Sequence, residues 1–209
     1  MKVLLINGSP RKNGCTFTAL TEVAGEIAAQ GIETEIFHIG NDPLRGCQAC
    51  GRCQKQKLNR CAFDDDPVNR CLALAAQADG LVVGSPVYFA GINSALGALL
   101  DRMFYSGSGQ LAYKPACGVV SCRRGGAGSA FDRLNKYFTI SNMPVVPSQY
   151  WNAVHGNTPA EVRQDEEGLQ IMRTLGRNMA WLVKSLAAAA DSAPRPAAEQ
   201  KRARTNFIR

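Results

Sequence analysis

The stretch that decides the fold runs from Val3 to Thr16 and reads VLLINGSPRKNGCT. Its first four residues are all apolar, which is typical of a strand buried on both faces of a parallel sheet. The next ten are mostly small, polar or basic, and they lead into a segment whose apolar residues recur at helical spacing. A strand, a glycine-containing loop and a helix in this order predict an anion site, because the first N–H groups of a helix have no partner within it.

This loop differs from two well-known phosphate loops. A Walker A loop needs a Gly-Lys pair, and the chain contains none. The dinucleotide fingerprint needs a glycine where Pro10 stands. Ser9 and Thr16 remain as hydroxyl donors and Arg11 as a cation for a phosphate. An ordinary turn is the alternative interpretation, since glycine, serine, proline and asparagine are also turn residues.

Strand-like and helix-like segments alternate along the rest of the chain. Further strands are expected at 32–39, 80–84, 115–121 and 144–148, and helices at 20–28, 67–78, 92–105 and 129–138. Right-handed crossovers then predict an α/β fold with three layers, a doubly wound parallel sheet of five strands in the order 2-1-3-4-5. Ligands bind such sheets at the carboxyl ends of the strands, so the loops after strands one, three and four are expected to meet.

The last helix is expected to begin at Thr158, as an N-cap, with Pro159 in its first turn and Glu161 as a capping-box partner. A buried stripe should follow, formed by Leu169, Met172, Leu175, Met179, Leu182 and Leu186. We therefore expect one domain over residues 1–190. Residues 191–209 form a basic tail, which we expect to pack along its own domain or a neighbouring subunit.

The loop Gly8–Thr16 resembles the flavin-phosphate loop of the flavodoxin-like NAD(P)H-dependent FMN reductases, a group that includes the iron–sulfur flavoproteins. The usual form of that loop has Asn where Cys15 stands. A second match is the run Ser85–Phe89, followed by Asn93-Ser94 and by Leu99–Arg102. The resemblance spans about residues 1–190, and it implies a flavodoxin-like fold, bound FMN and redox chemistry.

Three segments then become candidates for FMN contacts. Around the phosphate, the resemblance implies Ser9, Arg11, Asn13, Cys15, Thr16 and Phe17. Beside the isoalloxazine ring lie Pro86, Val87, Tyr88, Phe89 and Asn93, and at its pyrimidine edge Ser121, Cys122, Arg123, Arg124 and Gly126. Either arginine could instead bind a nicotinamide nucleotide phosphate or be plain solvated charge, and the aromatic pair could simply be a packed turn. His155 could donate a proton to the flavin or be a surface residue, and no catalytic side chain is assigned.

Eight cysteines are many for a chain of this size. Cys47, Cys50, Cys53 and Cys61 follow the pattern C-x2-C-x2-C-x7-C inside a long excursion at residues 40–66, which is unusual in a compact domain unless it is functional. The pattern resembles the compact motif with which iron–sulfur flavoproteins hold a [4Fe–4S] cluster. A four-cysteine zinc site and a metal-free excursion are the alternatives.

Composition limits the remaining classes of function. With 45% hydrophobic and 20% charged residues the chain is an ordinary globular protein, and its apolar runs are too short for a membrane span. We expect a cytoplasmic protein without a membrane partner. The net charge of +7 comes partly from the tail, and no nucleic-acid motif accompanies it, so a nucleic-acid partner is not expected.

The sequence therefore predicts an FMN-dependent NAD(P)H oxidoreductase that passes hydride from nicotinamide to FMN, and electrons onward to a small-molecule or protein acceptor. The alternative is an iron–sulfur flavoprotein that acts in electron transfer through the four-cysteine cluster. Because members of this group often place FMN near a subunit interface, the resemblance also implies a homo-oligomer, a dimer or a tetramer. A flavin-free regulatory or nucleic-acid-binding module that uses the basic tail is a third hypothesis.

Overall fold

Five parallel strands and one short antiparallel strand make up a single sheet in the computed structural model, which describes residues 1–197 and 205. The strands are β1 (Lys2–Asn7), β2 (Glu33–His38), β3 (Gly80–Tyr88), β4 (Gly91–Ile92), β5 (Ala116–Cys122) and β6 (Ala153–His155). They follow the order β2-β1-β3-β5-β6, with β4 paired to β3 outside this path. Counting only the parallel strands, this is the predicted order 2-1-3-4-5.

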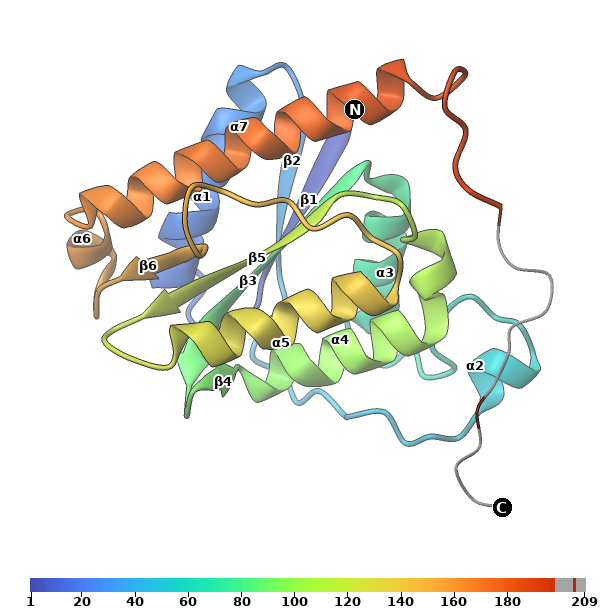
Figure 1. Ribbon diagram of the computed structural model, residues 1–209. Coiled ribbons are helices and arrows are strands. Elements are labelled where there is room, and N and C mark those ends of the chain that lie inside the picture. Colours follow the sequence, from blue (N-terminus) through green and yellow to red (C-terminus); the bar gives the residue numbers. More distant parts are fainter. Residues whose placement is uncertain (198–204, 206–209) are drawn as a thin grey trace.

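Helices cover both faces of the sheet (Figure 1). The long helices are α1 (Cys15–Ala29), α3 (Val68–Gln77), α4 (Ser94–Gly107), α5 (Ala127–Ile140) and α7 (Glu166–Ala188). Three short ones are α2 (Arg52–Lys55), α6 (Pro159–Val162) and the 3-10 turn η1 (Ser108–Gln110). Helices α1 and α7 pack on one face, and α3, α4 and α5 on the other. The three-layer α/β/α architecture is confirmed.

Strand β1 shows why its sequence is uniformly apolar. Leu4 and Ile6 belong to the core beneath α3, α4 and α5, whereas Val3 and Leu5 belong to the core beneath α1 and α7. All four side chains are fully buried. Because successive side chains of a strand point to opposite faces, a strand with a core on both sides needs apolar residues throughout.

The prediction of the fifth strand at residues 144–148 is wrong. The strand that completes the sheet is β6, which pairs with β5 through Ala153, Val154 and His155. Of the predicted segment, only Val145 forms an isolated bridge, to Ala116. Two prolines, Pro144 and Pro147, lack the N–H group that a continuing ladder requires.

The predicted start of the last helix is also wrong. Thr158 accepts a hydrogen bond from the Glu161 backbone N–H (3.2 Å), but the helix it caps, α6, is a single turn. The long helix α7 starts after Asp165, whose Oδ1 accepts from the Gly168 N–H (2.9 Å).

Only part of the predicted stripe on this helix is buried. Met172, Leu175 and Met179 lie in the core, but the buried face continues through Ala180 and Val183. Leu169 and Leu182 are partly buried, and Leu186 is exposed. An α-helix has 3.6 residues per turn, so residues three or four positions apart do not stay on one face indefinitely. The last leucines of the predicted stripe therefore lie outside the buried face.

The sequence also gave no sign of the β3–β4 hairpin. Val87 pairs with Ile92 and Tyr88 with Gly91, so the turn consists of Phe89 and Ala90. Their φ angles are +49° and +58°. Two-residue hairpin turns of this kind normally use Asn-Gly, because residues with a Cβ pay a steric cost at positive φ. The side chain of Phe89 is wholly exposed at this turn.

The structure bears on the membrane expectation, and it describes only part of the tail. Among the described residues, no helix combines the length and the apolar character that a membrane crossing requires. Residues 198–204 and 206–209 lie outside the described residues, so the packing of the tail stays a prediction.

Candidate functional site

Three loops meet at the carboxyl ends of the strands, as expected. The Gly8 N–H donates to the Gly84 carbonyl (2.9 Å), which joins the end of β1 to β3. Asn93, after β4, donates from Nδ2 to the Gly8 carbonyl (2.7 Å). Thr16, at the start of α1, shares a hydrogen bond with Ser121 at the end of β5 (2.8 Å between the two Oγ atoms). The three predicted segments therefore form one continuous surface.

The loop after β1 is organised by its own polar groups. The fully buried Asn7 accepts from the Ser9 N–H (3.1 Å) and donates to the Lys12 carbonyl (3.0 Å). Ser9 Oγ accepts from the Arg11 N–H (3.1 Å), and His38 Nε2 lies 2.7 Å from the Ser9 carbonyl oxygen. Sequence reasoning missed the role of Asn7. A polar residue that ends an apolar strand is the signal that could have found it.

The start of α1 has the features of an anion site. Gly14 is the N-cap, and no side chain in the described part of the chain caps the helix. Arg11, Lys12 and Asn13 are exposed around it, and Phe17 is partly exposed. Backbone N–H groups at such a helix start are available to an anion, and the helix dipole favours negative charge there.

Cys15 contributes a neutral thiol rather than a charge to this helix start. Its Sγ lies 3.7 Å from the Gly156 carbonyl oxygen, and partial burial raises its pKa above the usual thiol value. The side chain therefore ties the loop to the segment after β6. The backbone N–H is what this residue can offer to an anion.

The hydroxyl pair Thr16–Ser121 retains a donor. Both side chains are buried, and in their mutual hydrogen bond only one hydroxyl is the donor. The other hydroxyl keeps its hydrogen for a further acceptor. One hydroxyl hydrogen therefore remains available where the loops after β1 and β5 meet.

The hairpin β3–β4 and the loop after β5 form the second half of this surface. Asn93 is fixed by a hydrogen bond from its N–H to Ser85 Oγ (3.0 Å). Gly126 has a φ of +88°, and a Cβ placed there would lie 2.7 Å from Ala90 Cα. The loop after β5 therefore packs directly against the hairpin turn, and only glycine permits this approach.

The predicted ring contacts differ widely in exposure. Pro86 and Val87 are partly buried, whereas Tyr88 is about half exposed and Phe89 wholly so. In the loop after β5, Cys122 is buried and its Sγ donates to the Gly125 carbonyl (3.0 Å), while Arg123 and Arg124 are exposed. The surface thus offers aromatic side chains on one side and two cations on the other.

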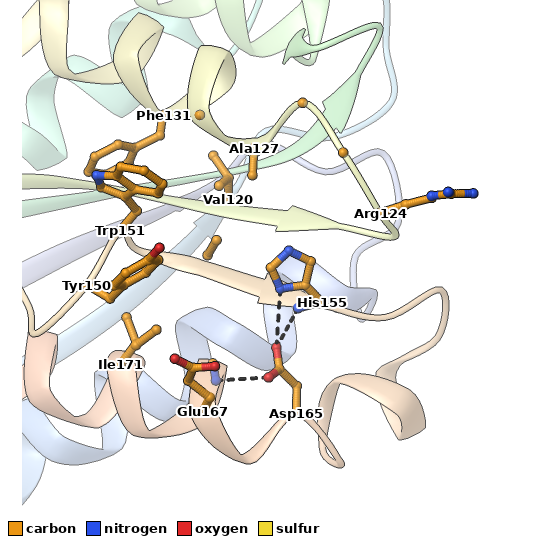
Figure 2. A pocket seen from close by; sticks show the side chains of 15 residues that line it. Val120, Arg124, Ala127, Phe131, Tyr150, Trp151, His155, Asp165, Glu167 and Ile171 are labelled. Carbon is orange, nitrogen blue, oxygen red and sulfur yellow. Dashed lines mark hydrogen bonds and ion pairs between the residues drawn. The ribbon is translucent and has the colours of Figure 1, made fainter.

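A pocket of about 330 Å³ lies beside β6 at the outer edge of the sheet, and Arg124, Gly125 and Gly126 of the loop after β5 form part of its lining (Figure 2). Tyr150 and Trp151 stand together on one side of it, and Arg124 points away from it. His155 Nδ1 lies 3.7 Å from Asp165 Oδ2, which also accepts from the His155 N–H (2.6 Å). No residue of the loops after β1 or β3 lines this pocket. Arg124, Gly126 and His155, which the sequence analysis singled out, line this pocket, but the pocket itself was not predicted.

The cysteine excursion contacts the C-terminal half of α4. Cys47, Cys50, Cys53 and Cys61 line one hollow of about 20 Å³, with Arg102 on its wall. Cys53 and Cys61 are buried and the other two are exposed, and all four are free thiols. Within the described residues, no group of three or more potential ligands is arranged to hold a metal ion.

Two arginines act on the sulfur atoms of this hollow. The backbone N–H and the guanidinium of Arg52 hold the pKa of the Cys50 thiol below its usual value. Arg102, whose side chain is 1% exposed, donates from Nε to Cys61 Sγ (3.3 Å). The contacts of Arg52 favour a negatively charged sulfur at Cys50.

Comparison with known proteins identifies the family of this chain. The model of the NADPH-dependent FMN reductase family matches residues 1–158, which include all three loops and the cysteine excursion. The chain belongs to the NADPH-dependent FMN reductase family. The chain is therefore an FMN-dependent oxidoreductase, as the sequence predicted.

Two relatives match most of this chain and nearly their own full length. An iron-sulfur flavoprotein of Methanocaldococcus jannaschii is 35% identical over 192 residues, covering 88% of this chain and 98% of the relative. An iron-sulfur flavoprotein of Methanosarcina thermophila is 31% identical over 185 residues, covering 86% and 93%. A flavodoxin structure from the domain Archaea aligns with a TM-score of 0.60 at 13% identity, covering 88% of this chain and 99% of the flavodoxin. That likeness confirms the flavodoxin-like fold.

The loops of this chain have groups that suit the phosphate end of FMN. A phosphate needs several hydrogen-bond donors and a positive potential. The helix start at Gly14 lacks a side-chain cap within the described residues, and the Thr16–Ser121 pair has a hydroxyl hydrogen left. Arg11 and Lys12 are exposed cations in the loop that leads into this helix. The exposed aromatic side chains of the hairpin suit an isoalloxazine face. The individual ligand contacts remain predictions.

The cysteine hollow fits an iron–sulfur cluster in its donors but not in its size. Four thiols near two arginines are a suitable donor set for a cluster held by thiolates. A hollow of about 20 Å³ has room for little more than one water molecule. Binding of a cluster would therefore require the excursion to open, so that metal binding and local folding would be coupled.

Proposed function

We propose that this FMN-dependent oxidoreductase oxidises NADPH and holds FMN across the loops after β1, β3 and β5. The observation that carries the proposal is the direct bonding of these loops, through Asn93 to Gly8 and through Thr16 to Ser121. FMN, when bound, supplies the hydride and electron chemistry. The chain supplies phosphate donors at the start of α1 and aromatic surface at Tyr88 and Phe89.

The test removes the phosphate donors. In the double variant Ser9→Ala/Thr16→Ala we expect most bound FMN to be lost, because two hydroxyl donors disappear and the loop loses its internal bond to the Arg11 N–H. Thr21→Ala is the matched control, since Thr21 Oγ1 donates only to the Phe17 carbonyl (2.8 Å) on the exposed side of α1. The measurement is the molar ratio of FMN to protein after purification. Equal ratios in the two variants would contradict the assignment.

For the nucleotide, we propose that Arg123 and Arg124 bind phosphate groups of NADPH. Both side chains are exposed on the loop that borders the proposed flavin site. The double variant Arg123→Ala/Arg124→Ala should raise the KM for NADPH by about tenfold, the size expected from one lost charged hydrogen bond. Its FMN content should stay unchanged. A normal KM for NADPH would rule out this role.

A second candidate function is electron transfer through an iron–sulfur cluster held by Cys47, Cys50, Cys53 and Cys61. Two observations favour it: the four thiols line one hollow, and the relatives with near full-length matches are named iron-sulfur flavoproteins. The electron acceptor would then be a small molecule or a protein.

The visible spectrum of protein purified without oxygen tests this candidate. We expect flavin bands together with a broad shoulder that dithionite bleaches, and about four iron atoms per chain, as in a [4Fe–4S] cluster. Cys53→Ser should remove the shoulder and the iron but leave the flavin. Cys71→Ser, which alters a fully buried thiol on α3, should keep both. Flavin bands without iron in the unaltered protein would exclude the cluster.

A further inference from the structure

The pocket beside β6 combines two kinds of surface. One is apolar: Val120 of β5, Ala153 of β6 and Ile171 of α7 are buried residues that line it. The other is aromatic, because Tyr150 and Trp151 stand next to each other with their ring centroids 5.0 Å apart (Figure 2). At about 330 Å³, the pocket has the volume of a site for a small organic molecule.

Both aromatic side chains are largely exposed. Tyr150 is 61% exposed and Trp151 is 63% exposed, although large aromatic side chains gain free energy when they are covered. They lie in the segment just before β6, where they form a side of the pocket rather than part of the core. Aromatic surface that stays open beside a cavity is typical of a binding site.

The charged groups that line the pocket leave one carboxylate available. Arg124 points away from the pocket (Figure 2). Asp165 is already engaged, since it accepts from the His155 and Gly168 N–H groups and faces the His155 ring. Glu167 is exposed, and it forms no ion pair with any residue that the structure describes. Its negative charge is therefore free to attract a ligand.

The start of α7 gives a second possible reason for this carboxylate. Glu166 and Glu167 both lie in the first turn of the helix, where the helix dipole favours negative charge. Of these two residues, Glu167 lines the pocket and Glu166 does not. The pair therefore separates a role in the helix from a role in the pocket.

We propose that the pocket beside β6 binds an organic cation, an amine or ammonium group carried on a small aromatic body. The ring faces of Tyr150 and Trp151 attract a cation, Glu167 supplies the opposite charge, and the apolar residues cover the body of the ligand. A neutral molecule uses the apolar and aromatic surface alone, and Glu167 repels an anion. The site is additional to the proposed flavin site, with which it shares the loop after β5.

Three probes with the same ring and different charge test the proposal: benzylammonium, benzyl alcohol and benzoate. The readout is the indole N–H resonance of Trp151 in isotope-labelled protein as purified, at neutral pH and constant ionic strength. The chain has two tryptophans, and the other, Trp181 on α7, does not line the pocket, so it is an internal control. The variant Trp181→Phe assigns the two resonances.

We expect each probe to shift the Trp151 resonance in a saturable way and to leave that of Trp181 in place. Benzylammonium should bind about fivefold more tightly than benzyl alcohol, the size expected from one exposed charge pair. Benzoate should bind more weakly than benzyl alcohol. Equal affinities for the three probes, or equal shifts of both tryptophans, would overturn the proposal.

Two matched variants then test the carboxylate. Glu167→Gln should remove the preference for the cation and leave the affinity for benzyl alcohol unchanged. Glu166→Gln removes the same charge from the same turn of α7 outside the pocket, so it should keep the preference. If both variants lose it equally, the field of the helix start and not a site at Glu167 is responsible, and the proposal is wrong.

The aromatic side of the pocket has a test of its own. Tyr150→Ala should weaken the binding of all three probes, because each uses the aromatic surface, and unchanged affinities would contradict this part of the proposal. These titrations need neither NADPH nor an electron acceptor. Their outcome is therefore separate from that of the proposed oxidoreductase function.

Discussion

Two glycines allow close packing at the carboxyl ends of β1 and β3, Gly8 against α4 and β3, and Gly84 against α1. A Cβ on Gly8 would lie 2.5 Å from Leu96 Cδ2 and 2.9 Å from the Gly84 carbonyl oxygen. A Cβ on Gly84 would lie 2.8 Å from Leu20 Cδ1 and 2.9 Å from Thr16 Cγ2. Neither glycine has a positive φ, so the requirement is for space rather than for an unusual backbone.

We therefore expect Gly84→Ala to destabilise the protein by about 1–3 kcal/mol, the usual cost of overpacking a filled interior. It should also lower FMN content, because the added methyl group pushes Thr16 away from Ser121. Urea denaturation and flavin content measure the two effects. Gly25→Ala is the control: Gly25 lies exposed within α1 with no atom in its way, so stability should rise by about 0.5–1 kcal/mol. Equal stability of the two variants would contradict the packing argument.

Tyr137 gives a prediction about pH. Burial and the hydrogen bond that its hydroxyl donates to Asp101 raise the pKa of Tyr137 from 10.0 to about 12. The folded state therefore binds this proton more tightly than the unfolded state, so the contribution to stability is complete below pH 10 and is lost between pH 10 and about 12. The ultraviolet absorbance of phenolate, compared between the unaltered protein and Tyr137→Phe, isolates this titration. Ionisation of Tyr137 at its ordinary pKa would contradict the expectation.

At the residue scale, the sequence pointed to groups whose ligand contacts stay predictions, and it missed the groups that hold their loop in place. Ser9 and Thr16 follow a recognisable strand–loop–helix pattern. Asn7 and His38 support the same loop, but their partners are backbone carbonyls and N–H groups, whose positions depend on the tertiary structure. Arg102 was visible only as part of a motif, because its partners lie 36 or more residues away.

At the scale of single elements, Asp165 connects the edge of the sheet to helix α7. One carboxylate oxygen caps the helix through the Gly168 N–H, and the other accepts from the His155 N–H of β6. The carboxylate therefore satisfies a helix end and a strand edge together. It also carries negative charge at the positive end of the helix dipole, which is favourable.

Asp165→Ala should lower the free energy of unfolding by about 1–2 kcal/mol, the usual cost of removing a helix cap. Asp165→Asn should keep most of the stability that Asp165→Ala loses, since the amide oxygen can still accept one hydrogen bond. Thr158→Ala removes the cap of the one-turn helix α6 and should cost less, because a single turn contributes little burial. Urea denaturation of the three variants gives the comparison. A larger loss in Thr158→Ala than in Asp165→Ala would show that α6 is the more important of the two helices.

The elements that the sequence predicted well are those with long, unbroken patterns. Strand β1 and helices α1 and α4 are examples. β6 has only three residues, which is too short for any periodic signal, and Pro144–Ser148 imitates a strand through its apolar residues. The β3–β4 hairpin escaped prediction because Phe-Ala is not a usual sequence for its turn.

At the scale of the whole molecule, α4 links the proposed flavin site to the cysteine excursion (Figure 1). Asn93 caps its first turn and bonds to the loop after β1, and Arg102 near its other end bonds to Cys61. One helix therefore contacts both the proposed flavin site and the cysteine excursion.

The oligomeric state also belongs to this scale. A dimer or a tetramer stays a prediction. Sedimentation of the FMN-loaded protein measures the oligomeric state directly. We expect a mass of two or four times 22.5 kDa for the loaded protein. A single 22.5 kDa species at micromolar concentration would contradict it.

The bond between Asp165 and the outward N–H of β6 has one more consequence. Exposed sheet edges are templates on which other chains can add strands, and so they are starting points for aggregation. Here the carboxylate occupies the donor that an incoming strand would need. The same substitution that uncaps α7 should therefore make the protein more prone to fibril formation on storage, even under conditions in which nearly every molecule is still folded.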